Sequence, residues 1–260
     1  MITGELKKRI TTSIILIAIV LNCLFIHNLT WLFLLSIVSL ICLFEFSSLC
    51  KKIWKNKITA YSLIFLSLLF LLLIVSFICW IEFINLNKKN WKKKAIIILP
   101  IILSFLFLLL FIYTAYKFRI ERGTIGMLFV LGVCVFSDIG GYIIGKSIGG
   151  KKLTKISPNK TISGRFGSFL FSLFPLGILM ILSLQLTSQE FNSSEKHILY
   201  CLLISLSCQL GDLIISYFKR LAKVKDTGKI LPGHGGMLDR IDGVIFAIPI
   251  TILIIHPLVF

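Results

Sequence analysis

The stretch AIIILPIILSFLFLLLFIYTAY, residues 95–116, contains no charged side chain. About 20 consecutive apolar residues are enough for an α-helix to cross the hydrocarbon core of a bilayer. The whole chain is 57% hydrophobic over 260 residues, whereas a soluble domain is about 45–50% apolar. This stretch therefore predicts a membrane-spanning helix.

Similar apolar runs recur along the chain and define the predicted fold. They cover residues 11–27, 30–48, 59–85, 95–116, 124–145, 167–186, 197–216 and 243–260. Backbone N–H and C=O groups in hydrocarbon have no water to bind, so each run must satisfy them internally as a helix. The sequence predicts an all-α integral membrane protein, a polytopic helical bundle.

The charges between the runs predict its orientation. The formal net charge is +17, and clusters of Lys and Arg follow the second, third, fifth and seventh runs. The positive-inside rule places these four loops in the cytoplasm. They can share one side only if 59–85 dips in and returns or forms two short helices, giving eight or nine crossings. The cost is an outside loop with Lys117, Arg119 and Arg122. Because no basic segment belongs to a soluble domain, we do not expect nucleic-acid binding.

This topology brings carboxylates together at the cytoplasmic face. Asp138 and Asp212 fall near the inner ends of their runs, and Asp239 and Asp242 near the inner start of the last run. We expect one continuous membrane domain, with N-terminal helices in 1–123 and a C-terminal catalytic region in 124–260.

Residues 211–243, GDLIISYFKRLAKVKDTGKILPGHGGMLDRIDG, carry most of the chemistry. The segment combines four aspartates with six glycines and six Lys or Arg. Carboxylate oxygens suit Mg²⁺, which shares its coordination sphere with phosphates. Lys and Arg neutralise phosphate charge, and glycine-rich backbone can form an anion nest. The alternative is that each Asp pairs with a nearby Lys or Arg as ordinary loop charge.

His234 has three candidate roles at the centre of this segment. It could donate to phosphate, act as a weak base, or fix the loop by hydrogen bonding. A phosphate already ionised at neutral pH needs no base to act as a nucleophile, so we favour a phosphate or loop role.

The segment resembles the signature of the phosphatidate cytidylyltransferase (CDP-diacylglycerol synthase) family. The matching residues are Ser216, Lys219, Arg220, Lys225, Asp226, Gly228, Leu231–Gly236, Leu238–Arg240 and Asp242. The resemblance implies CTP and phosphatidic acid as substrates and a requirement for Mg²⁺. It also implies a paired metal centre anchored by Asp212 and Asp239, with K⁺ as a candidate for the second cation.

Upstream motifs extend the resemblance over residues 124–260. Ser137–Tyr142, followed by Gly145 and Lys146, is similar to a second family motif, and Ile156–Thr161 resembles a family loop. For Asp138 the alternative is a buried structural ion pair, and for Lys160 a solvated loop charge. Glu45 resembles an intramembrane glutamate of the family, and we leave it outside the core site. Ile215 and Ile162–Gly164 depart from the family pattern, which puts any role of polar residues there in doubt.

The resemblance implies a membrane enzyme that makes CDP-diacylglycerol and pyrophosphate, in a bacterial inner membrane with its site facing the cytoplasm. Its expected catalytic residues are Asp212, Asp239, Asp242, Lys219, Arg220 and His234, and the three aspartates are also the expected metal ligands. Its expected substrate-binding residues are Asp138, Lys160, Ser216, Lys225, Asp226, Gly233, Gly235, Gly236 and Arg240. The alternatives are a CTP-dependent lipid-alcohol kinase and a membrane transporter. A homodimer is a further expectation.

Overall fold

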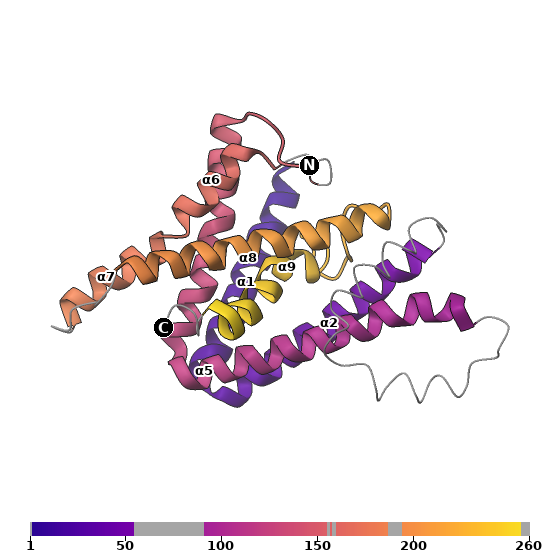
Figure 1. The fold of residues 1–260 in the computed structure, drawn as a ribbon, viewed down its shortest axis with the longest axis horizontal. Helices are drawn as coiled ribbons and strands as arrows, with labels where there is room; N and C mark the ends of the chain where they lie inside the picture. Colours follow the sequence, from indigo (N-terminus) through magenta and orange to yellow (C-terminus); the bar gives the residue numbers. More distant parts are fainter. Residues whose placement is uncertain (1, 55–90, 155–156, 158–159, 187–193, 256–260) are drawn as a thin grey trace. The chain divides into compact units, whose positions relative to one another are not determined.

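The computed structural model describes residues 2–54, 91–154, 157, 160–186 and 194–255. Within these ranges every regular element is a helix (Figure 1). The helices are α1 (Ile2–Ile26), α2 (Asn28–Trp54), α5 (Trp91–Ile148), α6 (Ile162–Phe171), α7 (Phe174–Leu186), α8 (Ser194–Leu221) and α9 (Leu238–Ile250), which continues as the π-helical turn η3 (Thr251–Ile255). The prediction of an all-α chain is confirmed.

Several of these helices are suited to a bilayer. Among the described residues, five helical segments are long and apolar enough to cross a membrane: Leu6–Ile26, Asn28–Ile53, Leu99–Ile148, Ile162–Ile181 and Glu195–Leu221. The chain is thus a membrane protein with several candidate spans. The total of eight or nine crossings stays a prediction, because the run 59–85 lies outside the described residues.

Helix α5 differs from the sequence prediction. The loop expected at Lys117–Arg122 is wrong, since these residues are helical and the direction changes only at Gly123 (φ 70°, ψ −171°). Lys117 and Glu121 form an (i, i+4) ion pair of 3.7 Å, which favours helix. Arg119 donates to the carbonyl oxygen of Leu24 at 2.9 Å through Nη2. Lys117, Arg119 and Glu121 therefore have partners while they remain in the helix.

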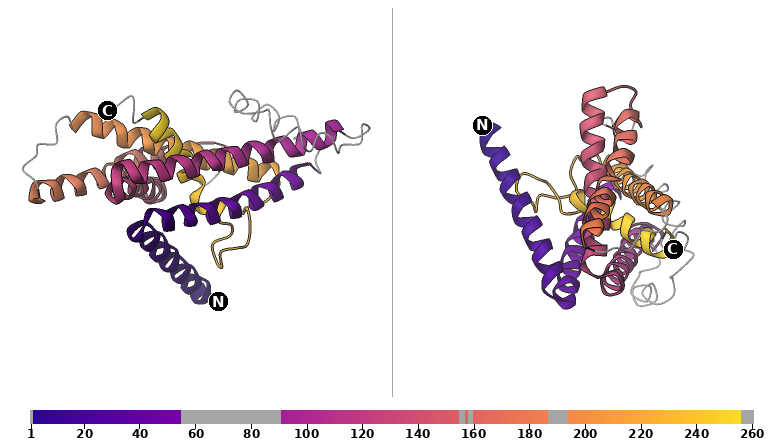
Figure 2. Two further views of the ribbon diagram at one scale, coloured as in Figure 1. Left: turned by 90° about the horizontal axis from the view of Figure 1, so that it is seen from below. Right: turned by 90° about the vertical axis from the view of Figure 1, so that its left-hand side faces the viewer.

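The C-terminal part of α5 lies beside α6 (Figures 1 and 2), and glycines allow the two helices to approach closely. A Cβ added at Gly167 would lie 2.5 Å from the Cβ of Ile144 and 2.6 Å from the carbonyl oxygen of Gly140. Small residues allow such close approach of helices in membranes. Helix α6 starts at Ile162, earlier than the predicted 167, because the Thr161 side chain caps it by accepting from the Gly164 N–H.

This contact predicts a stability effect. Gly167→Leu should lower the thermal unfolding midpoint of the purified protein, because a crowded interface costs about 1–3 kcal/mol when overfilled. Gly177→Leu in α7 is the matched control, since nothing lies within 4 Å of a Cβ added there. Equal midpoints for the two variants would contradict the close α5–α6 contact.

The chain divides into two compact units, each drawn from three stretches. Unit 1 comprises Met1–Ala18, Phe33–Ile112 and Phe218–Arg240, and unit 2 comprises Ile19–Leu32, Tyr113–Tyr217 and Ile241–Phe260. In unit 1 the rings of Phe46 and Phe218 meet edge to face with their centroids 5.1 Å apart. In unit 2 the rings of Phe129 and Tyr200 stack with their centroids 6.3 Å apart. The sequence-based division at residue 123 stays a prediction.

Candidate active site

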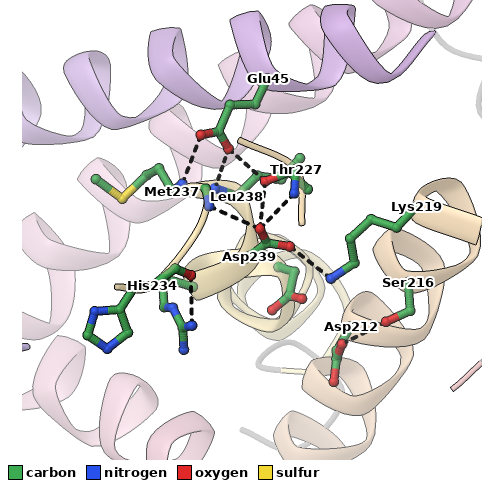
Figure 3. A network of polar contacts seen from close by, with 12 residues as sticks. Glu45, Asp212, Ser216, Lys219, Thr227, His234, Met237, Leu238 and Asp239 are labelled. Carbon is green, nitrogen blue, oxygen red and sulfur yellow. Dashed lines mark hydrogen bonds and ion pairs between the residues drawn. The ribbon is translucent and has the colours of Figure 1, made fainter. Parts of the chain in front are cut away.

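Asp239 is a buried carboxylate of unit 1 that four contacts hold in place. It is the second residue of α9, and its side chain is only 7% exposed. Its Oδ1 pairs with Lys219 Nζ at 2.8 Å. Its Oδ2 accepts from the Thr227 N–H at 2.8 Å, the Thr227 hydroxyl at 3.0 Å and the Gly236 N–H at 3.1 Å (Figure 3). These contacts fix the orientation of both carboxylate oxygens.

The same contacts set the ionisation of Asp239. Burial favours the neutral acid, but the hydrogen bonds from Lys219, Thr227 and Gly236 and the lysine charge outweigh it, so the pKa of Asp239 lies below its ordinary value. A lowered carboxyl pKa stabilises the fold above the unfolded-state pKa, and this contribution is lost as pH falls through the folded-state pKa. Asp239 is therefore an anion at neutral pH.

The glycines of the 232–236 loop make room for this arrangement. Gly233 (φ 77°) and Gly235 (φ 88°) adopt backbone conformations that other residues rarely take. A Cβ at Gly235 would lie 3.3 Å from Asp239 Oδ2 and 3.2 Å from Asp226 Cβ. The N–H of Gly235 donates to the Leu231 carbonyl at 3.2 Å, and the N–H of Gly236 donates to Asp239. Substrate binding by these glycines and by Asp226 stays a prediction.

His234 contacts the first helix. Its Nδ1 lies 2.6 Å from Thr12 Oγ1 and its Nε2 lies 3.3 Å from Ser13 Oγ. Its carbonyl accepts from Arg240 Nη2 at 2.9 Å. These are the contacts of the loop-fixing alternative, and the phosphate role stays a prediction. The sequence-based site missed Thr12 and Ser13, although two adjacent hydroxyls at the start of an apolar run were a signal.

The environment of His234 predicts a pH effect. Partial burial, followed by the charges of Arg240 and Arg9, lowers the pKa of His234 below 6.5. At a pH between the folded-state pKa of His234 and 6.5, the unfolded chain binds more protons at this histidine than the folded protein does. His234 therefore lowers the free energy of unfolding as pH falls through this range. Between about pH 7.5 and about pH 5.5, the unfolding midpoint should fall more in the wild type than in His234→Gln. If the unfolding midpoints of the wild type and His234→Gln changed equally with pH, a lowered pKa of His234 would be contradicted.

Unit 2 contains a polar cavity of about 310 Å³. Asp138, Lys160 and Asp212 line it together with Ser157, Thr161, Arg165, Ser168 and Gln209. Lys160 Nζ forms an ion pair with Asp212 Oδ2, and Ser216 donates to Asp212 Oδ1 at 3.2 Å. Asp138 is close enough to interact electrostatically with both Asp212 and Lys160. The structure thus brings together three of the predicted site residues from α5, the 149–161 loop and α8.

Asp242 lies where α9 packs against α8. A Cβ added at Gly211, next to Asp212, would lie 2.7 Å from the Asp242 carbonyl oxygen. The Asp242 side chain accepts from the Gly243 N–H at 2.9 Å. Small residues thus bring α9 close to the part of α8 that carries Asp212.

The remaining predicted residues and the metal ligands stay predictions. Arg220 lies in the last turn of α8, and Lys225 lies in the loop that follows. No cluster of three His, Cys, Asp or Glu side chains suited to a metal ion occurs in the part of the chain that the structure describes. Asp212 and Asp239 belong to different units, and a metal centre shared by them stays a prediction.

The fold and these carboxylates define an all-helical membrane protein with partly buried aspartates paired to lysines. The chain matches the model of the cytidylyltransferase family over residues 7–258 and belongs to that family.

The chain is also similar to curated phosphatidate cytidylyltransferases. It is 43% identical over 144 residues to that of Staphylococcus epidermidis, covering 54% of this chain and 53% of the relative. It is 43% identical over 145 residues to that of Staphylococcus aureus, with the same coverage. It is 42% identical over 144 residues to that of Staphylococcus saprophyticus, again with this coverage. The chain thus spans about half the length of the curated relatives it matches.

Proposed function

We propose that this protein is a phosphatidate cytidylyltransferase. The phosphate of phosphatidic acid attacks the α-phosphorus of CTP, a new P–O–P bond forms, and pyrophosphate leaves. Family membership and the names of the staphylococcal relatives support this activity. The observation that carries it is Asp239, an anion beside the glycine loop that is held by four contacts, one of them the ion pair with Lys219.

The carboxylates fit the proposed Mg²⁺ requirement. Asp212 and Asp239 offer the hard oxygen ligands that Mg²⁺ prefers, and both carry a lysine counter-ion. Asp242 is the third proposed ligand, and K⁺ is a candidate second cation. When bound, the metal would neutralise phosphate charge. The residues around Asp239 fit such an ion because they fix the carboxylate without removing its negative charge.

The lysines would bind and orient the substrates. Two anionic reactants repel each other, so the main task is to hold them aligned and neutralised. Lys160 and Lys219 each lie against a carboxylate in the structure. A phosphate group would recruit these ammonium groups as the carboxylates take up cation. Arg220, Lys225 and Arg240 are proposed to contact the remaining phosphate oxygens.

The proposed location is a bacterial inner membrane, with the site at its cytoplasmic face. The staphylococcal relatives are bacterial proteins, which supports this location. The lipid tails would stay in the bilayer while the head group reaches the basic loops. The basic loops would also attract anionic lipid head groups.

The deciding assay uses purified protein in detergent with CTP labelled at the α-phosphate, phosphatidic acid and Mg²⁺. We expect label in CDP-diacylglycerol and release of unlabelled pyrophosphate, both abolished by a chelator. Label in free CDP would indicate γ-phosphate transfer to a lipid alcohol instead. Ion flux in liposomes without any nucleotide product would support a transporter.

A further inference from the structure

Glu45 is a buried carboxylate that the proposed chemistry does not use. It lies in α2 and is 4% exposed. Its Oε1 accepts from the Met237 N–H at 3.0 Å, and its Oε2 accepts from the Leu238 N–H at 2.9 Å (Figure 3). The first N–H groups of a helix lack intrahelical acceptors, and a negative charge there is favourable. Glu45, a residue of α2, therefore caps the N-terminus of α9 at Leu238, the residue before Asp239.

Thr227 connects Glu45 to Asp239. Its hydroxyl lies 2.9 Å from Glu45 Oε2 and 3.0 Å from Asp239 Oδ2. A hydroxyl has one proton, so it can donate fully to only one of these carboxylates at a time. The Thr227 N–H, in contrast, donates to Asp239 alone at 2.8 Å. Thr227 thus ties two carboxylates, from α2 and α9, to one point of the loop.

Two glycines enclose the Glu45 carboxylate. A Cβ at Gly228 would collide with Glu45 Oε1, and one at Gly236 would lie 2.5 Å from Glu45 Oε2. The Gly236 Cβ would also collide with Thr227 Oγ1. The backbone at Gly228 and at Gly236 therefore lies so close to the Glu45 carboxylate that neither position has room for a side chain.

We propose that Glu45 and Thr227 are positioning residues, which hold the 227–238 segment so that Asp239 presents Oδ1 in one fixed orientation. This inference rests on the proposed function for its link to turnover, but the contacts themselves do not. Groups that orient a metal-binding carboxylate typically change metal affinity or activity about 10- to 100-fold when removed. Glu45 and Thr227 do not touch substrate in this role.

The test compares four variants of the full chain in detergent. Thr227→Val removes only the hydroxyl, and Thr227→Ser restores it. Glu45→Gln keeps the shape of the side chain but replaces one acceptor with an NH₂ group. Ser39→Ala is the control, because Ser39 is also buried in α2 and its hydroxyl has no hydrogen-bond partner among the described residues.

Two readouts do not depend on turnover. Without substrate, Mn²⁺ binding should weaken about 10- to 100-fold in Thr227→Val and Glu45→Gln, and Thr227→Ser and Ser39→Ala should bind like the wild type. Hydrogen exchange at the Met237 and Leu238 amides should become faster in Glu45→Gln and stay slow in Ser39→Ala. In turnover, the Mg²⁺ concentration for half-maximal rate should rise while the KM for phosphatidic acid stays unchanged.

The outcomes separate the two proposals. Unchanged Mn²⁺ binding in Thr227→Val together with unchanged amide protection in Glu45→Gln would overturn the positioning role, as would a wild type that binds no Mn²⁺. If Thr227→Val does not fold, a Thr227→Ser variant that also loses Mn²⁺ affinity overturns it. If the predicted binding and exchange changes occur but no CDP-diacylglycerol forms, the positioning role stands and the proposed function fails.

Discussion

Replacing Asp239 with asparagine should reduce cytidylyl transfer by about 1,000-fold or more while the protein still folds. The amide oxygen can still accept from Thr227 and Gly236, which hold Oδ2 in the wild type. The negative charge opposite Lys219 disappears, and an uncharged amide is a poor ligand for a divalent cation. A loss of about 4 kcal/mol of transition-state stabilisation corresponds to this fall in rate.

The measurement is kcat for CDP-diacylglycerol formation at saturating Mg²⁺, with the thermal unfolding midpoint as a check on folding. A matched control is Asp226→Asn, which also removes a carboxylate from the same loop region. Asp226 is a predicted substrate-binding residue, so we expect a smaller loss there. An Asp239→Asn protein with ordinary turnover would refute the metal role of Asp239.

Replacing Asp212 with asparagine should reduce cytidylyl transfer by about 100- to 1,000-fold. Asp212 lines the cavity of about 310 Å³ and pairs with Lys160. Without the carboxylate charge, Lys160 loses its partner and the cavity loses a proposed metal ligand. Ser216 can still donate to the amide oxygen, so the local helix should persist.

Ser216→Ala provides the comparison for this second prediction. It removes the 3.2 Å hydrogen bond to Asp212 Oδ1 but leaves the charge. We expect a loss of only about threefold to tenfold, because one neutral hydrogen-bond donor contributes about 0.5–1.5 kcal/mol. If Ser216→Ala is as damaging as Asp212→Asn, then orientation and not charge is what Asp212 supplies.

Local sequence predicted the helices better than their ends. The run 95–116 lies inside a helix because hydrocarbon-like side chains and backbone hydrogen bonding demand it. The loop predicted at Lys117–Arg122 was wrong, because Lys, Arg and Glu are good helix formers and Lys117 pairs with Glu121. Their position on the outer side of the membrane stays a prediction. Only Gly123, with its positive φ, interrupts the helix.

At the candidate site, the sequence indicated which residues matter but not which residues they contact. The sequence indicated Asp212, Asp239 and Lys219, since carboxylates and cations crowded beside apolar runs are costly without a function. It did not indicate that Lys160 would meet Asp212, or that Thr12 would meet His234. Glu45 was visible as a lone carboxylate in an apolar run, but the residues around it in the sequence did not predict its hydrogen-bond partners.

What the sequence by itself determined is the kind of protein: helical, embedded in lipid, and carrying acidic and basic groups at helix ends. These properties follow from the local density of apolar and charged side chains. Only the tertiary structure decided which donors each carboxylate meets. Glu45 and Thr227 are 182 residues apart in the chain and 2.9 Å apart in space, and such a contact depends on how whole helices pack against one another.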